Sequence, residues 1–251
     1  MILSESLQLM NRPQFELSVI LPTFNESENI IPLIEAISKN LREINYEIII
    51  CDDNSPDGTG LLTQKTYRGQ TSCVRTIIRK KDKGLARSVL QGIKQARGNL
   101  IAVMDTDFNH NPDKLPQMYR LIRKTDIIVG SRYVKGGGME NRWRNLLSLL
   151  YNRLIRFILK LPVYDNLSGF FMFKKSKLKP LLRPDIFCGY GDYFIRLLFE
   201  AKKRKLLIRE IPVFYPNRLH GSSKSRFLGI LVQYSRTVMS LLRSNLIKHP
   251  D

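Results

Sequence analysis

The chain has 251 residues, 43% of them hydrophobic, which is enough for one folded domain. Its three cysteines include no C-x-x-C pair, which argues against a disulfide framework and a zinc site. Residues 1–131 contain 17 Lys and Arg against 15 Asp and Glu, a net charge of +2, whereas residues 132–251 contain 24 against 7, a net charge of +17. This asymmetry predicts a polyanionic partner for the second part, with nucleic acid, anionic lipid headgroups and phosphorylated substrates all eligible.

Short apolar runs rich in β-branched residues alternate with helical periods through the first half of the chain. We expect strands at Leu17–Pro22, Tyr46–Cys51, Val74–Arg79, Leu100–Met104 and Asp126–Gly130. Helices are expected near residues 28–43, 59–67, 84–97 and 113–124. This alternation predicts an α/β fold with a mostly parallel central sheet that is covered by helices on both faces.

The second half is less regular. Helical periodicity marks residues 142–160 and 225–244, and strands are expected at Ser168–Phe173 and Leu207–Phe214. No internal repeat or long linker interrupts the chain. The predicted organisation is an N-terminal extension over residues 1–16, one domain over 17–224, and a C-terminal amphipathic helix with a tail over 225–251.

Neither secretion nor a membrane span is expected. The N-terminus, MILSESLQLMNRP, lacks the basic start of a signal peptide and carries Glu5 inside the stretch that would have to be apolar. No uncharged apolar run approaches the ~18 residues that a spanning helix needs. We therefore expect a cytoplasmic protein, and the unpaired cysteines fit that reducing compartment.

Residues 145–161 form an amphipathic helical pattern. Its apolar arc consists of Leu146, Leu147, Leu150, Tyr151, Leu154, Phe157, Ile158 and Leu161, and its polar arc of Asn145, Asn152, Arg153, Arg156 and Lys160. Such a helix can lie among anionic lipid headgroups, which favours a peripheral membrane protein, or it can face an ordinary core. The pattern does not choose between the two, and residues 225–244 pose the same question.

The predicted parallel strands end in polar loops, which are Thr23–Glu26, Asp52–Thr59, Lys80–Gly84 and Asp105–His110. Ligands of such sheets bind at the carboxyl ends of the strands, so we expect the site to assemble from these loops. The first strand is not followed by G-x-G-x-x-G, and G-x-x-x-x-G-K-[ST] is absent from the chain. Dinucleotide and P-loop binding are therefore not supported.

Paired carboxylates follow two of the strands. Asp105 and Asp107 come directly after a buried strand, where they can share Mg²⁺ or Mn²⁺ together with phosphate oxygens and water, although an Asx turn would use the same residues. Asp52 and Asp53 end another strand and can accept hydrogen bonds from a base or a ribose, or form a turn. Several polar strand ends on one sheet edge favour a binding site.

In this order and spacing the motifs resemble the family 2 glycosyltransferases of GT-A (Rossmann-like) fold, and within them the dolichyl- or polyprenyl-phosphate mannose synthases. The resemblance runs from about Leu17 to about Val238. Its segments are SVILPTFNESENI, YEIIICDDNSPDGT, KKDKGLARSVLQGIKQARGN, MDTDFNHNP, IIVGSRYVKGGG, NLSGFFMFKK, IREIPVFYPNR and GSSK. The resemblance implies that this fold is built around residues 17–224, with membrane-surface helices in the second half.

The resemblance also implies roles for single residues. The nucleotide-sugar pocket would be lined by Pro22, Phe24, Asn25, Glu26, Asp53, Asp105, Thr106 and Asp107, with Cys51 at its edge. The metal ligands would be Asp105, Asp107 and Asn109, and the acceptor phosphate would be held by Arg132, Arg144 and Ser148. A mobile loop with Arg218 and Lys224 would close over the donor diphosphate, and the residues expected to act in catalysis are Asp105, Asp107, Arg132 and Lys224.

The implied reaction is transfer of a hexose, most simply mannose from GDP-mannose, to a dolichyl or polyprenyl phosphate with inversion of configuration. A phosphate monoester has its second pKa near ~6 and is already nucleophilic at neutral pH, so no catalytic base is required. His110 beside a Pro-containing turn is more often structural than catalytic. The implied partners are the nucleotide sugar, the lipid phosphate and the membrane surface, with a small membrane-anchoring subunit as an alternative way of attachment.

The chain departs from the family at CGYGDYFIRLLFEA, where relatives commonly have Gly-aromatic-Lys followed by Glu and this chain has Ile195 near the Glu position. Either Asp192 substitutes or the acceptor contacts differ. Two alternatives stay open: another donor such as UDP-glucose, or a saccharide hydroxyl acceptor, which would need a general base, with Asp192 as the first candidate. Nucleic acid is disfavoured because the basic residues accompany no RNA-binding aromatic motif.

Overall fold

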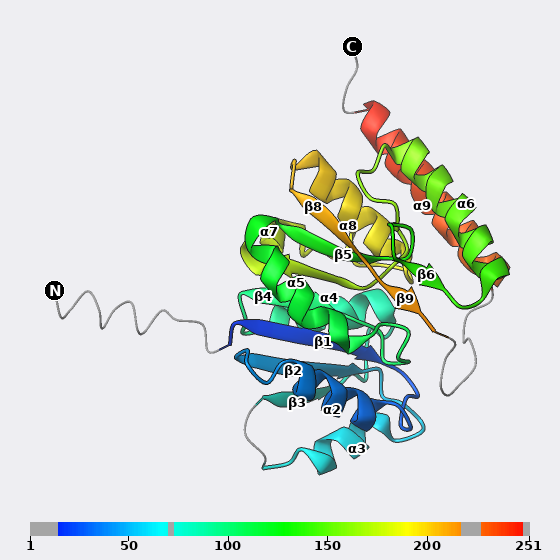
Figure 1. Cartoon of the computed structure of the whole chain (residues 1–251). Coiled ribbons are helices and arrows are strands. Elements are labelled where there is room, and N and C mark those ends of the chain that lie inside the picture. Colours follow the sequence, from blue (N-terminus) through cyan, green and yellow to red (C-terminus); the bar gives the residue numbers. More distant parts are fainter. Residues whose placement is uncertain (1–14, 70–72, 217–226, 248–251) are drawn as a thin grey trace, which may run out of the picture.

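The computed structural model describes residues 15–69, 73–216 and 227–247, and its core is a seven-stranded sheet with the order β3-β2-β1-β4-β7-β5-β8. Its strands are β1 (Leu17–Thr23), β2 (Tyr46–Asp52), β3 (Val74–Ile78), β4 (Leu100–Val103), β5 (Ile127–Ser131), β7 (Phe171–Lys174) and β8 (Ile208–Pro212). Only β7 runs antiparallel to its neighbours, between β4 and β5. The predicted mostly parallel sheet is thus confirmed (Figure 1).

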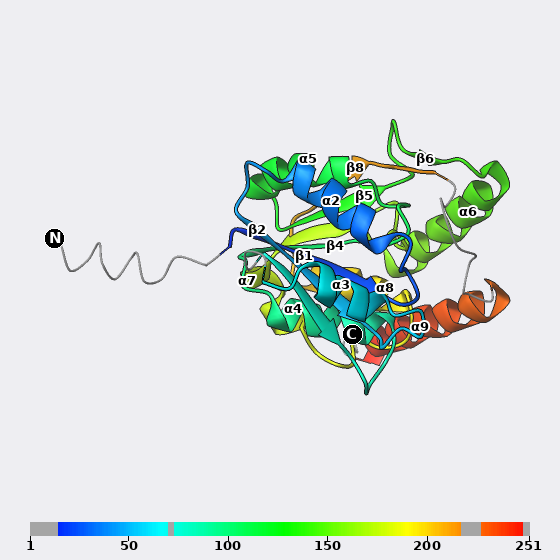
Figure 2. The ribbon, with the colours of Figure 1, turned by 90° about the horizontal axis from the view of Figure 1, so that it is seen from below.

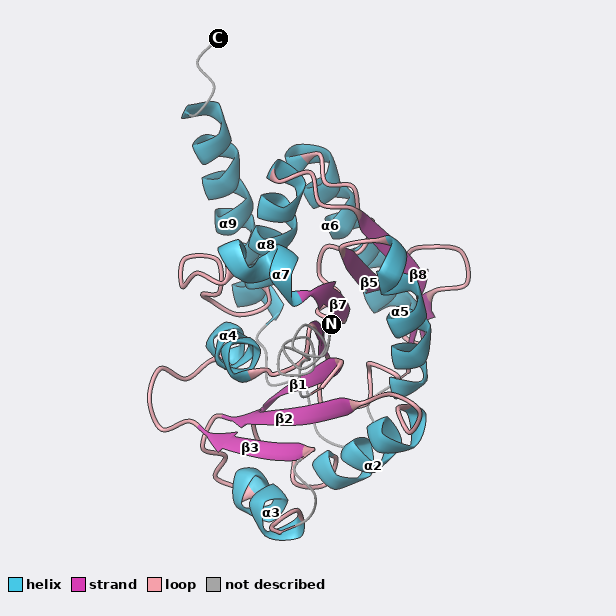
Figure 3. Ribbon diagram, turned by 90° about the vertical axis from the view of Figure 1, so that its left-hand side faces the viewer, coloured by secondary structure: helices cyan, strands magenta, loops and turns pink. Residues whose placement is uncertain are grey.

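Helices cover both faces of the sheet (Figures 2 and 3). They are α2 (Ile30–Asn40), α3 (Thr59–Thr66), α4 (Leu85–Gln95), α5 (Leu115–Leu121), α6 (Arg142–Leu159), α7 (Lys175–Leu178), α8 (Asp192–Lys203) and α9 (Phe227–Ile247). Short 3₁₀ turns lie at Pro112–Lys114, Ile122–Lys124 and Lys179–Leu181. Helices α2 and α5 pack on one face, and α4 and α8 pack on the other, so the sheet separates two apolar clusters.

The sequence patterns explain these layers. Every residue of β1 is buried, as expected for a central strand covered on both faces. Helix α2 buries its side chains at positions 30, 33, 34 and 37, the spacing of one helical face. Each such apolar side chain contributes about 1.5–3 kcal/mol when fully buried. Burial on both faces therefore fixes the strand ends from which the polar loops leave.

Several elements of the second half differ from expectation. Helix α8 was not predicted, although the polar residues of its sequence recur at helical spacing, at Asp192, Arg196, Glu200 and Lys203. The expected strand Leu207–Phe214 is divided into β8 and β9 (Phe214–Tyr215), and β9 pairs with β6 (Gly138–Met139) in a separate two-stranded sheet. The expected strand Ser168–Phe173 begins only at Phe171, after Gly169 adopts a positive φ of 70°.

Helices α6 and α9 lie side by side and extend beyond the sheet (Figure 1). The hydroxyl of Tyr151 on α6 donates to the Leu231 carbonyl at 3.3 Å and lies 3.0 Å from the Ser235 hydroxyl on α9. Helix α9 also buries Tyr234 and Val238 in the core cluster of α4 and α8. Among the described helices, none is both long and apolar enough to cross a bilayer.

Candidate active site

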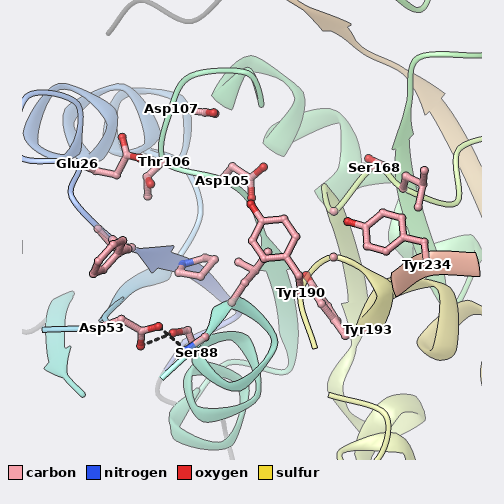
Figure 4. A pocket seen from close by; sticks show the side chains of 18 residues that line it. Glu26, Asp53, Ser88, Asp105, Thr106, Asp107, Ser168, Tyr190, Tyr193 and Tyr234 are labelled. Atoms are coloured by element: carbon pink, nitrogen blue, oxygen red, sulfur yellow. Dashed lines mark hydrogen bonds between the residues drawn. The ribbon is translucent and has the colours of Figure 1, made fainter. Parts of the chain in front are cut away.

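A cavity of about 360 Å³ opens at the carboxyl ends of β1, β2 and β4. We call it the strand-end cavity. Of the residues expected to hold a nucleotide sugar, those that line it are Pro22, Phe24, Glu26, Asp53, Asp105, Thr106 and Asp107 (Figure 4). The structure therefore gathers three of the predicted polar loops at one sheet edge, and the fourth contributes Gly84.

Asp53 is fixed in this cavity by three donors. The buried guanidinium of Arg79 pairs with its carboxylate, the Ser88 hydroxyl donates to it at 2.8 Å, and the Gly84 N–H donates at 2.6 Å. A carboxylate has about four acceptor positions, so these three contacts leave room for one further donor from a ligand. The preceding Asp52 instead accepts from the Ser55 N–H at 2.9 Å and forms the turn. Of the two neighbouring carboxylates, one thus lines the cavity and the other holds a turn.

His110 positions the loop that carries the Asp105–Asp107 pair. It is fully buried, its ring is stacked on Phe170 at 4.9 Å, and its Nδ1 accepts a hydrogen bond from the Asp105 N–H at 2.8 Å. Its Nε2 lies 3.1 Å from the Ser168 carbonyl, which can only accept, so the ring proton belongs on Nε2. Both ring nitrogens are engaged with backbone groups, one at Asp105 and one at Ser168. This arrangement supports a structural role for His110.

The two carboxylates of this loop differ in exposure. The Asp105 side chain is 43% exposed. Asp107 is buried and accepts from the Asn109 N–H at 3.2 Å and from its side-chain amide at 2.8 Å. Nowhere in the described residues do three or more His, Cys, Asp or Glu side chains cluster as a metal site. Two carboxylates fit a hard cation that is completed by water and phosphate oxygens, and they do not fit a closed zinc site.

A second cavity of about 260 Å³ adjoins the first. We call it the helix cavity, because α6 and α9 form much of its wall. The three predicted acceptor residues all line it, and so does Asn109. The residues that line both cavities are Asp105, Leu167, Ser168, Tyr190 and Tyr234. The two cavities therefore meet beside Asp105.

The two arginines of the helix cavity are not equivalent. Arg132 is buried and makes a forked ion pair with the buried Asp165, with Nε–Oδ2 2.8 Å and Nη2–Oδ1 2.7 Å. Burial disfavours its charge, but the Asp165 carboxylate outweighs burial and raises the pKa of Arg132. Its guanidinium also lies over the Tyr215 ring at 4.9 Å. Arg144 is exposed at the start of α6, which makes it the more accessible cation.

Some expected site residues lie elsewhere. The thiol of Cys51 packs in the core against α4, and burial raises its pKa to about 12, so its side chain does not reach the strand-end cavity. Asn25 adopts a positive φ of 56° and its N–H donates to the Ser55 hydroxyl at 3.0 Å, beside rather than in the cavity lining. Arg218 and Lys224 lie outside the described residues.

Asp192 is not placed to act in either cavity. It is fully buried at the start of α8 and forms an ion pair with Arg196 at 2.7 Å. It also accepts hydrogen bonds from Gln233 at 3.0 Å and from Thr237 at 2.9 Å, both on α9. The carboxylate is therefore a structural link between α8 and α9.

Sequence reasoning missed several residues that shape the site. They are Asp165, Ser168, Tyr190, Tyr193 and Tyr234. The adjacent Asp165 and Asn166, both fully buried, follow a short apolar segment, and a charged residue in such a setting is a signal that could have been used. Tyr234 carries no such signal, since its position depends on how α9 packs.

Comparison of the sequence with known proteins finds a matching family and related proteins. The model described as glycosyl transferase family 2 matches residues 18–182. The chain is 34% identical to a dolichol-phosphate mannosyltransferase of Pyrococcus furiosus over 235 residues, which is 91% of this chain and 64% of that relative. It is 30% identical to a polyprenol monophosphomannose synthase of Mycolicibacterium smegmatis over 219 residues, covering 85% of this chain and 82% of the relative. The chain thus spans just under two thirds of the length of the Pyrococcus relative.

A solved structure shares the fold at low identity. The glucosyl-3-phosphoglycerate synthase of Mycobacterium tuberculosis, in complex with Mn²⁺, uridine diphosphate and phosphoglyceric acid, superposes with a TM-score of 0.67 at 20% identity. The match covers 94% of this chain and 80% of that chain. At this identity the likeness concerns the fold alone.

Proposed function

Because the chain belongs to glycosyl transferase family 2, we propose that it transfers a hexose from a nucleoside diphosphate sugar to a polyprenyl or dolichyl phosphate, with inversion at the anomeric carbon. GDP-mannose is the first donor to test, since both relatives named above are mannosyl-transferring enzymes. The observation that carries the proposal is the meeting of two cavities beside Asp105, one with acidic strand ends and the other with arginines.

The strand-end cavity suits the donor. The held carboxylate of Asp53 can accept an N–H of the base, and Phe24, which lines the same cavity, offers an apolar surface. Asp105 and Asp107 would hold a divalent cation, Mg²⁺ or Mn²⁺, together with the diphosphate. When bound, this cation supplies neutralisation of the charge that develops on the leaving diphosphate.

The helix cavity suits an ionised phosphate. Arg144 is the accessible cation, and the paired Arg132 and the Ser148 hydroxyl complete a polar wall. A phosphate monoester needs no general base, because it is largely ionised at neutral pH. A saccharide hydroxyl would need one, and the candidate Asp192 is buried and engaged in hydrogen bonds. The chemistry of the site therefore favours the phosphate acceptor.

Helix α6 carries an exposed apolar face that suits a membrane surface. Its large exposed side chains are Trp143, Leu146, Leu147, Leu150, Leu154 and Phe157. Trp143 is 77% exposed and Phe157 is 81% exposed, and exposed Arg142, Arg153 and Lys160 lie on the same helix or at its end. Basic residues beside an apolar helical face favour anionic lipid surfaces.

This face adjoins the acceptor cavity. Leu147 and Tyr151 of α6 line the helix cavity together with Ile230 and Leu231 of α9. A lipid phosphate held by Arg144 would thus keep its chain close to the exposed face of α6. We propose that the protein acts at the cytoplasmic surface of a membrane, with the lipid surface itself as the partner of α6. A small protein subunit is the alternative occupant.

The test is the fate of a labelled sugar. The protein is incubated with Mg²⁺ or Mn²⁺, polyprenyl phosphate and radiolabelled GDP-mannose, and UDP-glucose is assayed in parallel. We expect label in the organic phase, in a product that is cleaved by mild acid, only when metal and lipid phosphate are both present. Label that passes to a saccharide acceptor, or none transferred from either donor, would contradict the proposal.

A further inference from the structure

Two tyrosines from different segments line the junction of the strand-end cavity and the helix cavity. Tyr190 precedes α8, and Tyr234 lies in the middle of α9. Figure 4 shows the Tyr190 ring reaching toward Asp105 and the Tyr234 hydroxyl directed toward the cavity. Helix α9 therefore contributes a polar group to the centre of the site, although it is the last helix of the chain.

The position of Tyr234 is fixed by its neighbours. The side chain is 8% exposed, and its hydroxyl has a hydrogen bond with the Gly191 backbone. A Cβ at Gly191 would come within 2.2 Å of the Tyr234 hydroxyl oxygen, so only glycine leaves room for it there. Gln233 and Thr237, on either side of Tyr234, bind the Asp192 carboxylate and tie α9 to the start of α8.

The charges around the junction differ from those of the helix cavity. Burial, with the neighbouring Tyr190, Asp192 and Asp105, raises the pKa of the Tyr234 phenol, so this hydroxyl stays neutral and keeps its proton. Arg132 and Arg144 line the helix cavity and are not among the residues of the strand-end cavity. Apart from the Asp105 carboxylate, the polar side chains shared by the two cavities are thus the hydroxyl groups of Ser168, Tyr190 and Tyr234, while the cations lie in the helix cavity.

The separation of the arginines from the junction indicates which part of the substrates lies beside Tyr234. In the proposed reaction the nucleotide stays in one cavity and the lipid phosphate in the other. Only the transferred sugar belongs to both, because it enters on the diphosphate and leaves on the phosphate. We infer that Tyr234 of helix α9 hydrogen-bonds a hydroxyl of the transferred sugar and helps to determine which sugar is accepted. The inference rests on the proposed function and adds a specificity-determining residue to it.

Specificity follows from the burial of this hydroxyl. A buried hydroxyl that loses its partner is left unsatisfied, so a site of this kind discriminates against sugars that place their hydroxyl elsewhere. Replacement of Tyr234 by phenylalanine keeps the ring and removes the hydroxyl, with its hydrogen bonds to the sugar and to the Gly191 backbone. The variant should therefore bind the nucleotide normally and distinguish poorly between epimeric sugars.

The test compares Tyr234→Phe with a matched control, Tyr119→Phe. Tyr119 donates its hydroxyl to Glu16 at 3.0 Å and lines neither cavity. Calorimetry measures the affinity for the nucleoside diphosphate and for the nucleotide sugar, each with Mg²⁺. We expect Tyr234→Phe to lose about tenfold in affinity for the nucleotide sugar, as for one hydrogen bond, and less than twofold for the nucleoside diphosphate. Tyr119→Phe should match the unchanged protein in both.

Kinetics give the second measurement. In Tyr234→Phe, kcat/KM for the preferred donor should fall about tenfold. The ratio of kcat/KM for the preferred donor to kcat/KM for its C2 epimer should decrease. The KM for lipid phosphate should be unchanged. Gly191→Ala, which displaces the hydroxyl through the new Cβ, should act in the same direction.

A rise confined to the KM for lipid phosphate would assign Tyr234 to the acceptor and overturn the inference. So would a Tyr234→Phe protein that is equal to Tyr119→Phe in every measurement. If the unchanged protein transferred no sugar to lipid phosphate, the proposed function would fail. The calorimetric comparison of nucleotide sugar with nucleotide would still test Tyr234 on its own.

Discussion

The strand-end cavity and the helix cavity are built in different ways. The first takes Asp53, Asp105 and Asp107 from short segments that directly follow strands, so a few consecutive residues decide both the strand and the polar loop. The second takes its residues from α6, α9 and separated loops, and Arg132 depends on Asp165, which lies 33 positions away. The strand-end cavity is therefore encoded locally, whereas the helix cavity depends on tertiary packing.

The largest effect is expected from the carboxylates at the meeting point. Asp105→Ala or Asp107→Ala should reduce turnover about a thousandfold or more, because charge stabilisation of the leaving diphosphate is lost. EDTA should do the same, and added Mg²⁺ should restore activity. The control is Asp113→Ala, an exposed carboxylate near the same loop that lines neither cavity. Full activity in the presence of chelator would contradict the proposal that Asp105 and Asp107 hold a catalytic cation.

Substitutions of the two arginines of the helix cavity should have different effects, one on the stability of the protein and the other on the use of lipid phosphate. Arg132→Ala leaves Asp165 buried without its partner, which is expected to cost about 3–5 kcal/mol of unfolding free energy. Arg144→Ala should leave stability unchanged and raise the KM for lipid phosphate about tenfold or more, since a hydrogen bond to a charged group is worth ~1.5–3 kcal/mol. Urea denaturation and initial rates measure the two quantities.

The double variant Arg132→Ala with Asp165→Asn provides the matched control. It removes the buried charge together with its partner, so it should recover part of the stability that Arg132→Ala loses. An Arg144→Ala protein that loses affinity for the nucleotide instead would show that this arginine belongs to the donor.

Membrane binding should depend on the exposed face of α6. Leu150→Gln with Leu154→Gln should weaken sedimentation with vesicles that contain phosphatidylserine by more than tenfold, because two apolar side chains no longer enter the interface. Leu61→Gln is the control, since Leu61 is 66% exposed but lies on α3 in the strand half. Unchanged sedimentation of the double variant would leave a protein subunit as the partner of α6.

The smallest effect concerns Asp57, which joins two loops of the strand-end side. Its carboxylate accepts from the N–H groups of Thr59 and Ser27, each at 3.0 Å. Burial alone would raise the pKa of Asp57, but these contacts and the Thr59 hydroxyl lower it below its ordinary value of 3.8.

A lowered pKa in the folded state means that the stabilisation is present above pH ~4 and is lost as the pH falls through the folded pKa. Asp57→Asn should therefore be slightly less stable than the unchanged protein at neutral pH, with a difference that shrinks below pH ~4. Urea midpoints at several pH values measure it, and Asp185→Asn, an exposed carboxylate in the other half, is the control. A difference that is independent of pH would assign the effect to the loop backbone.

Much of the fold could be predicted where burial is continuous. β1, β2 and β4 begin at the residues that their apolar runs indicate, because central parallel strands are apolar on both faces. The antiparallel insertion of β7 between β4 and β5 could not be predicted, since strand order follows from pairing between distant segments. Helix α8 was missed although Asp192, Arg196 and Glu200 recur at helical spacing, a signal that could have been used.

The same distinction holds for the site. Asp105, Asp107 and Asp53 follow strands, and the rule for strand ends locates them without any knowledge of packing. Tyr234 and Asp165 reach the site only because α9 packs on α8 and because the loop after α6 returns to β5. Cys51 shows the opposite error, since Asp53 of the same motif lines the cavity while the Cys51 side chain lies in the core.

The central claim is that an acceptor phosphate in the helix cavity lies next to a cation held by Asp105 and Asp107. Phosphorus NMR of a soluble short-chain prenyl phosphate, with Mn²⁺ and nucleoside diphosphate bound to the protein, measures this proximity directly, because Mn²⁺ broadens the signals of nearby nuclei. We predict strong broadening of the prenyl phosphate signal that is lost in Arg144→Ala and is absent when Mg²⁺ replaces Mn²⁺. A prenyl phosphate signal that stays sharp while both ligands are bound would contradict the claim that the two cavities form one site.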